Sequence, residues 1–382
     1  MRYCKRCVMP DTRPRIEFDE EGVCNACRYA EKKKKIDWDA RKQKFKEILD
    51  KYRSKDPMKY DCVIPVSGGK DSTYIAYIMK NEYKMNPLAV TFAPNIYTNV
   101  GSKNAENFKK IGIDHILFTP NREVLRKLSR KMFINYGDPL IPWVTGVYSI
   151  PLRVAVNFKI PLVIYAECGE AEYGGSTEKD DDYEICETDL RKFVRTGDAK
   201  DWKYPENWVD EEISLSDLKP YIFPSQEEMD SAGIKAIYFG YFHYWDDYEH
   251  YKFVKEKIGF NEVEGRKEGT YTTYSSIDDK LDDLYMHLMY LKFGFGRATK
   301  DACKDIRAGR LTRDEAIELV RKYDGELPYQ YLRDVLNFLD MDEREFWKVL
   351  ESFRNKEIWE KVGDEWRLKN PIWEEGKGNK NR

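Results

Sequence analysis

The sequence lacks several features that define whole classes of protein. Its net charge is only −3, from 65 Lys and Arg against 68 Asp and Glu, so it has no overall positive field that would attract nucleic acid. No apolar run approaches the roughly 20 residues that cross a bilayer, and the start, Met1-Arg2-Tyr3-Cys4, has no apolar signal stretch. We therefore expect a cytoplasmic protein that is not bound to membranes, and the charge balance argues against nucleic acid as a partner.

Half of the eight cysteines follow a regular spacing near the amino terminus, and the other four are scattered. Without an export signal, the reducing cytosol favours metal binding over disulfides. The pattern Cys4-x2-Cys7-x16-Cys24-x2-Cys27 matches the spacing that supplies four thiolates to a tetrahedral zinc ion. Four thiolates leave no open coordination position, so the expected Zn²⁺ is structural and folds a ribbon over residues 1–35. An iron–sulfur cluster and paired disulfides are the alternatives.

The chain beyond the ribbon changes character twice. Residues 36–57 are expected to form a linker with a helix from Trp38 to about Tyr52. Apolar runs then alternate with helical segments: the expected strands are 61–66, 87–92, 115–118, 161–166 and 234–239, and the expected helices 72–78, 103–111 and 122–133. This alternation predicts an α/β domain over residues 58–240, with a parallel sheet covered by helices on both faces.

The last part of the chain has a different texture. Beyond Asp278, apolar residues recur at three-and-four spacing, and residues 311–315 are typical of a capped helix start. We expect residues 241–382 to form a mainly helical domain that binds substrate or partner. A polar insertion at about 180–217 and a polar, frayed tail at 374–382 complete the expected layout.

A compact glycine-rich loop joins the first expected strand of the α/β domain to the following helix. It comprises Ser67, Gly68, Gly69, Lys70, Asp71 and Ser72. The glycines let backbone N–H groups approach phosphate oxygens, and the helix amino terminus adds a favourable dipole. Ser67, Lys70 and Ser72 add donors, whereas Asp71 is expected to orient the loop or hold Mg²⁺. The sequence is not a Walker loop, in which four residues separate the two glycines. We expect Lys70 on an exposed loop that binds ATP, and a turn without a ligand is the alternative.

The strand expected at 161–166 runs into a segment of acids and glycines. In an open parallel sheet the carboxyl ends of the strands face the ligand crevice. Glu167, Glu170 and Glu172 are therefore candidates to bind magnesium or orient an incoming nitrogen, and a solvated loop is the alternative. Cys168 is either a catalytic thiol or a buried, inert one.

Two later segments mix aromatic faces, glycines and charges. They are 241–246, with Tyr244 and Trp245, and 292–302, with Arg297 and Lys300. We expect these four residues to bind a sugar or a nucleotide diphosphate, since arginine forks pair well with phosphate. Core packing is the alternative for the aromatic residues and for His243. The other histidines are expected to be structural or surface residues without a role in the site.

These motifs together resemble a known family. The SGGKDS loop resembles the PP-loop of ATP pyrophosphatases, which implies a HUP-like parallel sheet. With the cysteine ribbon that opens Tyr3-Cys4, the segment Ala166 to Glu170 and the segment Lys292 to Thr299, nearly the whole chain resembles the N-acetyl sugar amidotransferases. The resemblance implies that Lys70, Asp71, Glu167 and Glu170 are catalytic, with ATP and Mg²⁺ bound at the loop and a nucleotide-linked N-acetylated sugar as substrate.

The resemblance also implies a reaction and partners. ATP adenylates the acetamido oxygen, ammonia from separate glutaminase and cyclase-like subunits adds to the carbon, and AMP departs to leave an acetamidino sugar for bacterial surface polysaccharide. Neither an amino-terminal cysteine nor a nucleophile elbow is present, in agreement with a borrowed ammonia supply. A tRNA thiouridine synthase of the same superfamily is the alternative, although a second cysteine group near the carboxyl terminus is missing. An inactive nucleotide sensor is disfavoured by the intact loop.

Overall fold

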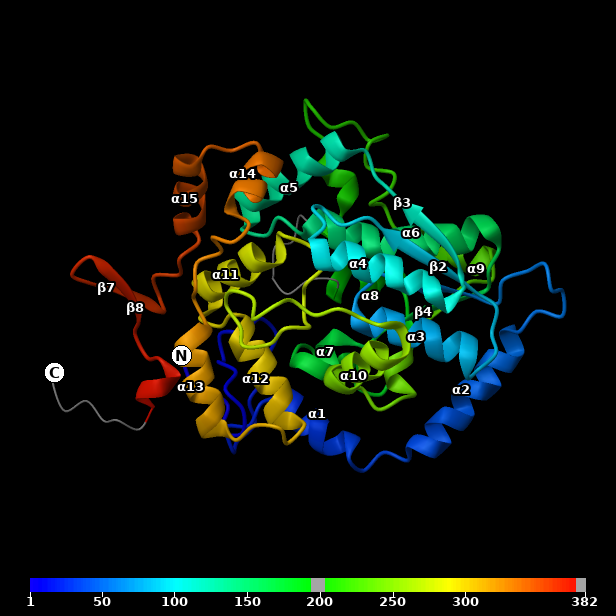
Figure 1. Ribbon diagram of the computed structural model, residues 1–382, viewed down its shortest axis with the longest axis horizontal. Helices are drawn as coiled ribbons and strands as arrows, with labels where there is room; N and C mark the ends of the chain where they lie inside the picture. The colour runs from blue at the N-terminus through cyan, green and yellow to red at the C-terminus, as the bar shows by residue number, and fades with distance from the viewer. Residues whose placement is uncertain (194–202, 376–382) are drawn as a thin grey trace.

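A six-stranded sheet forms the centre of the α/β region (Figure 1). The computed structural model describes residues 1–193 and 203–375. The sheet has the order β3-β2-β1-β4-β6-β5, and every neighbouring pair is parallel except β5 with β6. The strands are β1 Cys62–Pro65, β2 Pro87–Phe92, β3 Asp114–Phe118, β4 Leu162–Tyr165, β5 Glu184–Ile185 and β6 Lys235–Tyr238. The predicted fold class is confirmed: a mainly parallel sheet, a helical carboxyl-terminal region and an amino-terminal cysteine cluster.

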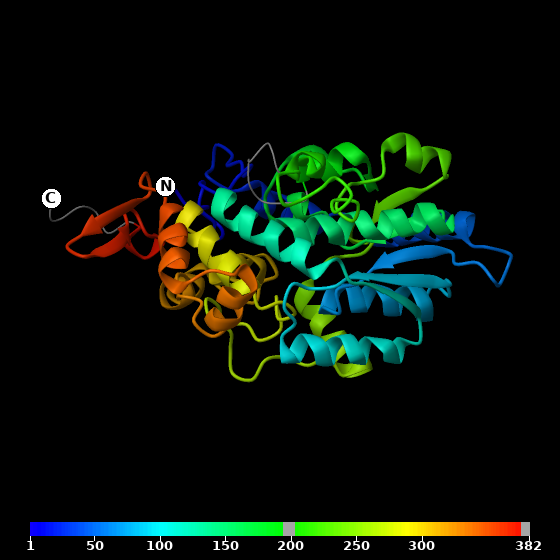
Figure 2. The ribbon, with the colours of Figure 1, turned by 90° about the horizontal axis from the view of Figure 1, so that it is seen from above.

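Helices cover both faces of this sheet, as Figure 2 shows. One face packs Val63, Leu88 and Val163 against helices α5 Arg122–Tyr136 and α6 Ile141–Phe158. The other face packs Ile64 and Ile164 against helices α3 Lys70–Asn81, α4 Asn99–Phe108 and α10 Asp247–Ile258. Because both faces are buried, the strands are continuous apolar runs, and this property made them recognisable in the sequence. The strand order reverses between β1 and β4, which opens a crevice at their carboxyl ends.

Helix α6 is an element that periodicity did not predict. It is apolar almost all round and contains Pro151, so neither a polar face nor an uninterrupted helical run marks it. Gly146 lets it lie close to the sheet, because a Cβ atom there would lie 2.4 Å from the Phe92 ring. By contrast, α2 Trp38–Tyr52 has the predicted bounds and buries Phe45 and Leu49. None of the helices within the described ranges combines the length and apolarity of a membrane-spanning segment.

The carboxyl-terminal part is helical, as predicted, and ends in a hairpin that was not predicted. Its elements are α11 Asp282–Phe293, α12 Arg297–Arg307, α13 Arg313–Tyr323, α14 Leu332–Leu339, α15 Glu343–Ser352, β7 Trp359–Val362 and β8 Glu365–Leu368. Thr312 and Glu315 form the capping box at the start of α13 that the sequence indicated. The expected domain boundary at residue 240 stays a prediction, and α10, which follows it, packs on the face of the sheet that carries α3.

The ribbon and these helices share one hydrophobic core. Val8 and Met9 of the ribbon pack in the same cluster as Leu288, Phe295 and Cys303. The Thr12 hydroxyl donates to the Phe293 carbonyl at 2.5 Å, and the Tyr3 hydroxyl donates to Asn370 O at 3.1 Å. The amino terminus is therefore anchored to the far end of the chain, on the side of the crevice opposite the loop after β1.

The remaining helices are short. They are α1 Asn25–Lys33, α7 Gly169–Tyr173, α8 Glu187–Phe193, α9 Gln226–Ser231 and the 3-10 turns Lys109–Ile111, Thr177–Lys179, Pro205–Trp208, Phe239–Tyr241 and Ile372–Glu374. Part of the polar insertion expected at 180–217, and most of the expected frayed tail, lie outside the described residues. Within the insertion, the described part supplies β5 and α8.

Candidate functional site

A cavity of about 310 Å³ lies at the carboxyl ends of β1 and β4. The loop after β1 and Glu167, which follows β4, form one side of it. Met9 and Arg13 of the ribbon and four basic residues of α12 form the other side. The cavity therefore brings together segments that are as far apart in the chain as residues 9 and 307, at the position where open parallel sheets bind ligands.

Hydrogen bonds within the SGGKDS loop fix its conformation. The Ser67 hydroxyl accepts from Gly69 N–H at 3.1 Å, and the Ser72 hydroxyl donates to Gly69 O at 3.2 Å. Gly68 has φ +89°, which favours glycine, and a Cβ atom there would lie 3.4 Å from the Ala105 backbone. Gly69 is the N-cap of α3 and provides no side-chain cap, so the N–H groups of the first turn are free for an anion in the described part of the chain.

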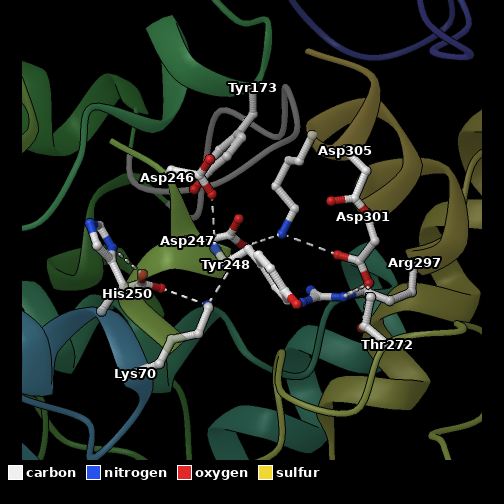
Figure 3. Close-up of polar contacts among 12 residues, drawn as sticks. Lys70, Tyr173, Asp246, Asp247, Tyr248, His250, Thr272, Arg297, Asp301 and Asp305 are labelled. Carbon is white, nitrogen blue, oxygen red and sulfur yellow. Dashed lines mark hydrogen bonds and ion pairs between the residues drawn. The ribbon is translucent and has the colours of Figure 1, made fainter. Parts of the chain in front are cut away.

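Lys70 corrects one expectation, because it is buried and not on an exposed loop. Lys70 is the first residue of α3, and its side chain points toward the start of α10. Its Nζ lies 2.7 Å from Asp71 Oδ2 and 3.7 Å from Asp247 Oδ2 (Figure 3). Burial acts to lower the pKa of Lys70, but the charges of Asp71 and Asp247 outweigh it and hold that pKa above its usual value. Lys70 is therefore a fixed cation at the mouth of the loop.

Two residues of α10 that the sequence did not mark as functional complete this network. Asp247 binds both Lys70 and Lys304, and Lys304 Nζ lies 2.5 Å from Asp247 Oδ2. His250 Nδ1 lies 2.9 Å from Asp71 Oδ1, and its ring stacks on Tyr74 with 4.1 Å between centroids. Helical spacing after the aromatic segment could have placed both residues on one face of α10, but their partners are distant in the chain.

Glu167 lies in the cavity, as expected for a residue after β4. The Tyr173 hydroxyl donates to its Oε1 at 2.8 Å. Burial, reinforced by the charge of Asp71, raises the pKa of Glu167 to about 7. Neighbouring Cys168 is different: burial raises the pKa of its thiol to about 12, so the reactive thiolate is scarce at neutral pH. Glu167 thus has the pKa of a general base, and Cys168 has the properties of the inert alternative.

Four of the predicted residues lie outside the cavity: Glu170, Glu172, Tyr244 and Trp245. The Glu170 carboxylate accepts from Arg15 Nε and Nη2 at 2.8 and 2.7 Å, and this pairing turns it toward the ribbon. Trp245 is buried, and Tyr244 is 44% exposed. Both aromatic residues line a separate small hollow of about 40 Å³ beside Lys33 and Glu172. We therefore give Glu170 a structural role, and no contact with the main cavity supports the expectation for Tyr244 and Trp245.

Arg297 and Lys300 both reach the cavity from α12, as the sequence indicated. Lys304 and Arg307 follow at helical spacing on the same face. Arg297 Nε lies 3.3 Å from Asp301 Oδ2 (Figure 3). Lys304 Nζ lies 3.2 Å from Asp301 Oδ1. Asp301 is itself fixed by the hydroxyls of Thr270 and Thr272 at 2.8 and 2.9 Å. Asp301 thus holds the side chains of Arg297 and Lys304 in place on the basic face of α12.

The acids near the loop fit a magnesium ion that is shared with phosphates. Asp71, Asp247 and Asp278 line the cavity, and Asp278 Oδ1 is buried without a hydrogen-bond partner among the described residues. Burial, together with the charge of Asp282, raises the pKa of Asp278 to about 7. No three acidic oxygens of the described chain converge within 4.8 Å. Mg²⁺ normally takes only one or two carboxylates when phosphates complete its shell, so these residues fit a nucleotide-bound ion.

The four cysteines fit a zinc ion. Their Sγ atoms all lie within 4.8 Å of one another, and the pairs Cys4–Cys27 and Cys7–Cys24 are 3.9 and 3.7 Å apart. A tetrahedral zinc with bonds of about 2.3 Å would place its sulfur atoms about 3.8 Å apart. Cys24 N–H points at Cys4 Sγ at 3.2 Å, which favours a thiolate. All four are buried, as a structural site requires.

Comparison with known proteins finds a family match in the carboxyl-terminal part of the chain. Residues 268–372 match the family described as "LPS biosynthesis protein WbpG-like, C-terminal domain". This stretch includes α11 and the basic helix α12 of the cavity. The carboxyl-terminal region is thus similar to that domain, which agrees with the resemblance to N-acetyl sugar amidotransferases.

Two proteins of Methanocaldococcus jannaschii show more limited similarity. An uncharacterized protein is 30% identical over 108 residues, which are 28% of this chain and 38% of that protein. The chain thus matches little more than a third of that relative. The crystal structure of a "predicted subunit of tRNA methyltransferase" is 19% identical over 60% of this chain and 86% of that chain, with a TM-score of 0.26. At that score the likeness carries no argument about function.

Proposed function

We propose that this chain is the synthetase half of an ATP-dependent amidotransferase that acts in lipopolysaccharide biosynthesis. It adenylates the N-acetyl group of a nucleotide-linked sugar and replaces the oxygen with ammonia, which gives an acetamidino sugar, AMP and pyrophosphate. The observation that carries this proposal is the shared cavity: the SGGKDS loop and Glu167 face the basic helix of the WbpG-like domain across it.

Two successive substitutions account for all atoms of the reaction. The acetamido oxygen attacks the α-phosphorus of ATP, and pyrophosphate leaves with the electrons of the broken P–O bond. Ammonia then adds to the imidate carbon, and AMP departs with the former acetamido oxygen. Activation must come first, because an amide oxygen is a poor leaving group and AMP is a good one.

The residues of the cavity match these two steps. Lys70 and the free N–H groups of α3 would neutralise the triphosphate, and Mg²⁺, held by acids such as Asp71, Asp247 or Asp278, would add positive charge at the phosphates. Glu167, whose pKa is about 7, can accept the proton that the added nitrogen must lose. Ammonia would come from separate glutaminase and cyclase-like subunits.

Oxygen-18 provides the decisive experiment. The purified protein is incubated with ATP, an ammonium salt and nucleotide-linked N-acetylated sugars that carry ¹⁸O in the acetamido group. We expect the label in the phosphate of AMP and the acetamidino product in equal amount, both detected by mass spectrometry. AMP formation without label transfer from any sugar tested, or pyrophosphate release only with tRNA and a sulfur donor, would contradict the proposal.

A further inference from the structure

The cations that line the cavity fall into two groups. Lys70, Lys304 and Arg297 each lie within 4 Å of a carboxylate. Arg13 and Lys300 have no carboxylate within 4.0 Å among the described residues, although both line the cavity. Buried charges in proteins are normally paired, since desolvation without a counter-charge is costly. The second group, Arg13 and Lys300, therefore has no direct negative partner among the described residues, and a bound anion could supply one.

Arg13 is well placed to bind such a partner. It is only 6% exposed, and its Nη1 donates to the carbonyls of Pro14 and Gly174. These two bonds fix the guanidinium while Nε and Nη2 have no hydrogen-bond partner in the described part of the chain. The planar fork of arginine matches the oxygen pairs of phosphate and carboxylate groups.

Lys300 approaches the same place from α12. Burial, together with the charges of Arg297, Arg13 and Lys304, lowers the pKa of its ammonium group to about 7. Several cations thus lie close enough to Lys300 to repel its charge, an arrangement that a bound anion would relieve. Arg307, farther along the same face, differs, because the ribbon thiols of Cys7, Cys24 and Cys27 lie within electrostatic range of it.

One carboxylate lies between the loop lysine and the basic helix α12. The Asp247 carboxylate lies between Lys70, at 3.7 Å, and Lys304, at 2.5 Å, and Lys304 also binds Asp301. The negative charge of Asp247 beside both lysines disfavours a single phosphate chain that extends from Lys70 past Lys304. The geometry favours two separate anions in one cavity.

We propose that Arg13 and Lys300 form a second anion subsite, which binds the phosphoryl group of the acceptor while the SGGKDS loop binds ATP. The identity of the acceptor rests on the proposed function, whereas the existence of the subsite does not. The amino-terminal ribbon thereby contributes a binding residue to the reaction cavity in addition to its own fold.

Binding of inorganic pyrophosphate tests the subsite without catalysis. Isothermal titration calorimetry is performed on the zinc-loaded, full-length protein while a saturating, non-hydrolysable ATP analogue and magnesium fill the loop. We expect one further pyrophosphate to bind. Arg13→Met and Lys300→Met should each weaken it at least about tenfold, as expected when a charge-assisted hydrogen bond is lost. The affinity for the ATP analogue should stay within about twofold.

Matched variants control for the loss of a surface charge and for folding. Arg344→Met and Lys348→Met remove exposed cations of α15 and should leave both affinities unchanged. Arg13→Lys should recover part of the pyrophosphate affinity, and zinc content and thermal midpoint report whether the ribbon is intact. Should Arg13→Met fail to fold, Lys300→Met tests the subsite from the helical side.

Three outcomes would overturn the subsite. The wild-type protein could bind no pyrophosphate when the loop is filled, or the variants could bind pyrophosphate as tightly as the wild type does. In the third outcome, the variants lose affinity for the ATP analogue as well as for pyrophosphate. The last result would assign the cluster to the phosphates of ATP.

A competition experiment tests which ligand the subsite binds. Displacement of pyrophosphate by a nucleoside-diphosphate N-acetyl sugar, but not by N-acetylglucosamine, assigns the subsite to the acceptor, and equal displacement by the neutral sugar refutes that assignment. Pyrophosphate binding without amidination would refute only the proposed function.

Discussion

The two sides of the cavity are built on opposite principles. On the loop side, Lys70 has two carboxylate neighbours, and His250 holds one of them in place. On the side of the ribbon and α12, Arg13 and Lys300 have no carboxylate within 4.0 Å in the described ranges. The charge of Lys70 is paired before a ligand arrives, whereas Arg13 and Lys300 are paired only by a ligand. Substitutions on the first side should therefore change the rate, whereas those on the second should change the affinity for the acceptor.

Removal of zinc should have the largest effect, because the ribbon supports the second side. Its residues share a core with α11 to α15, and Arg13 lies in the cavity, so loss of the metal should abolish acceptor turnover. Hydrogen exchange should rise in residues 1–35 and in α11–α13, while β1, β2 and β4 stay protected. Cys24→Ser should behave like chelation, and Cys168→Ser, which changes a thiol outside the cluster, should stay active. Full activity of a zinc-free protein would show that the two sides are independent.

Loss of the Lys70 charge should be the most damaging single change on the loop side. Lys70→Gln should lower kcat/KM for ATP by about 10²–10³, the usual effect of removing one preorganised donor to a developing charge. It should also lower the thermal midpoint, since Asp71 loses its nearest cation. Lys51→Gln, on the exposed face of α2, is the matched control. A variant that loses only acceptor affinity would place Lys70 on the wrong side of the comparison.

Glu167, on the loop side of the cavity, should control the pH dependence. A carboxyl group with a pKa of about 7 is protonated below that pH, so a rate that needs the free base should rise through pH 7 and then level off. Glu167→Gln should remove this rise and lower kcat by about 10². The hydrogen bond from Tyr173 lowers the pKa of Glu167. Tyr173→Phe removes that bond, so the pKa of Glu167 and the rise in rate should both move to higher pH. An unchanged profile in both variants would exclude Glu167 as the base.

The same comparison explains what could be predicted from the sequence. The loop side is encoded in consecutive residues, since strand β1, the turn and helix α3 follow one another, and local pattern suffices for such a unit. The strands were recognisable because β1, β2 and β4 are buried on both faces. The cysteine spacing identified the ribbon for the same local reason.

The other side depends on contacts that no local pattern contains. Arg13 reaches the cavity only because the ribbon packs on α11 and α12, and Asp247 becomes important only because α10 lies against α3. Glu170 was expected in the cavity because it follows β4, but Arg15, 155 residues earlier, holds it elsewhere. Lys70 was expected to be exposed for a similar reason: α10, which buries it, begins 177 residues later.

His250 should give the smallest of these effects, because it acts on Asp71 and not on a ligand. Its Nδ1 lies 2.9 Å from Asp71 Oδ1, and stacking on Tyr74 fixes the ring. His250→Ala should lower kcat by about fivefold, the loss expected when one positioning hydrogen bond of about 1 kcal/mol is removed, and should leave the acceptor KM unchanged. His250→Asn, which keeps a donor, should recover part of the rate. A change in acceptor KM alone, measured by steady-state kinetics, would mean that α10 serves the basic side of the cavity through Asp247.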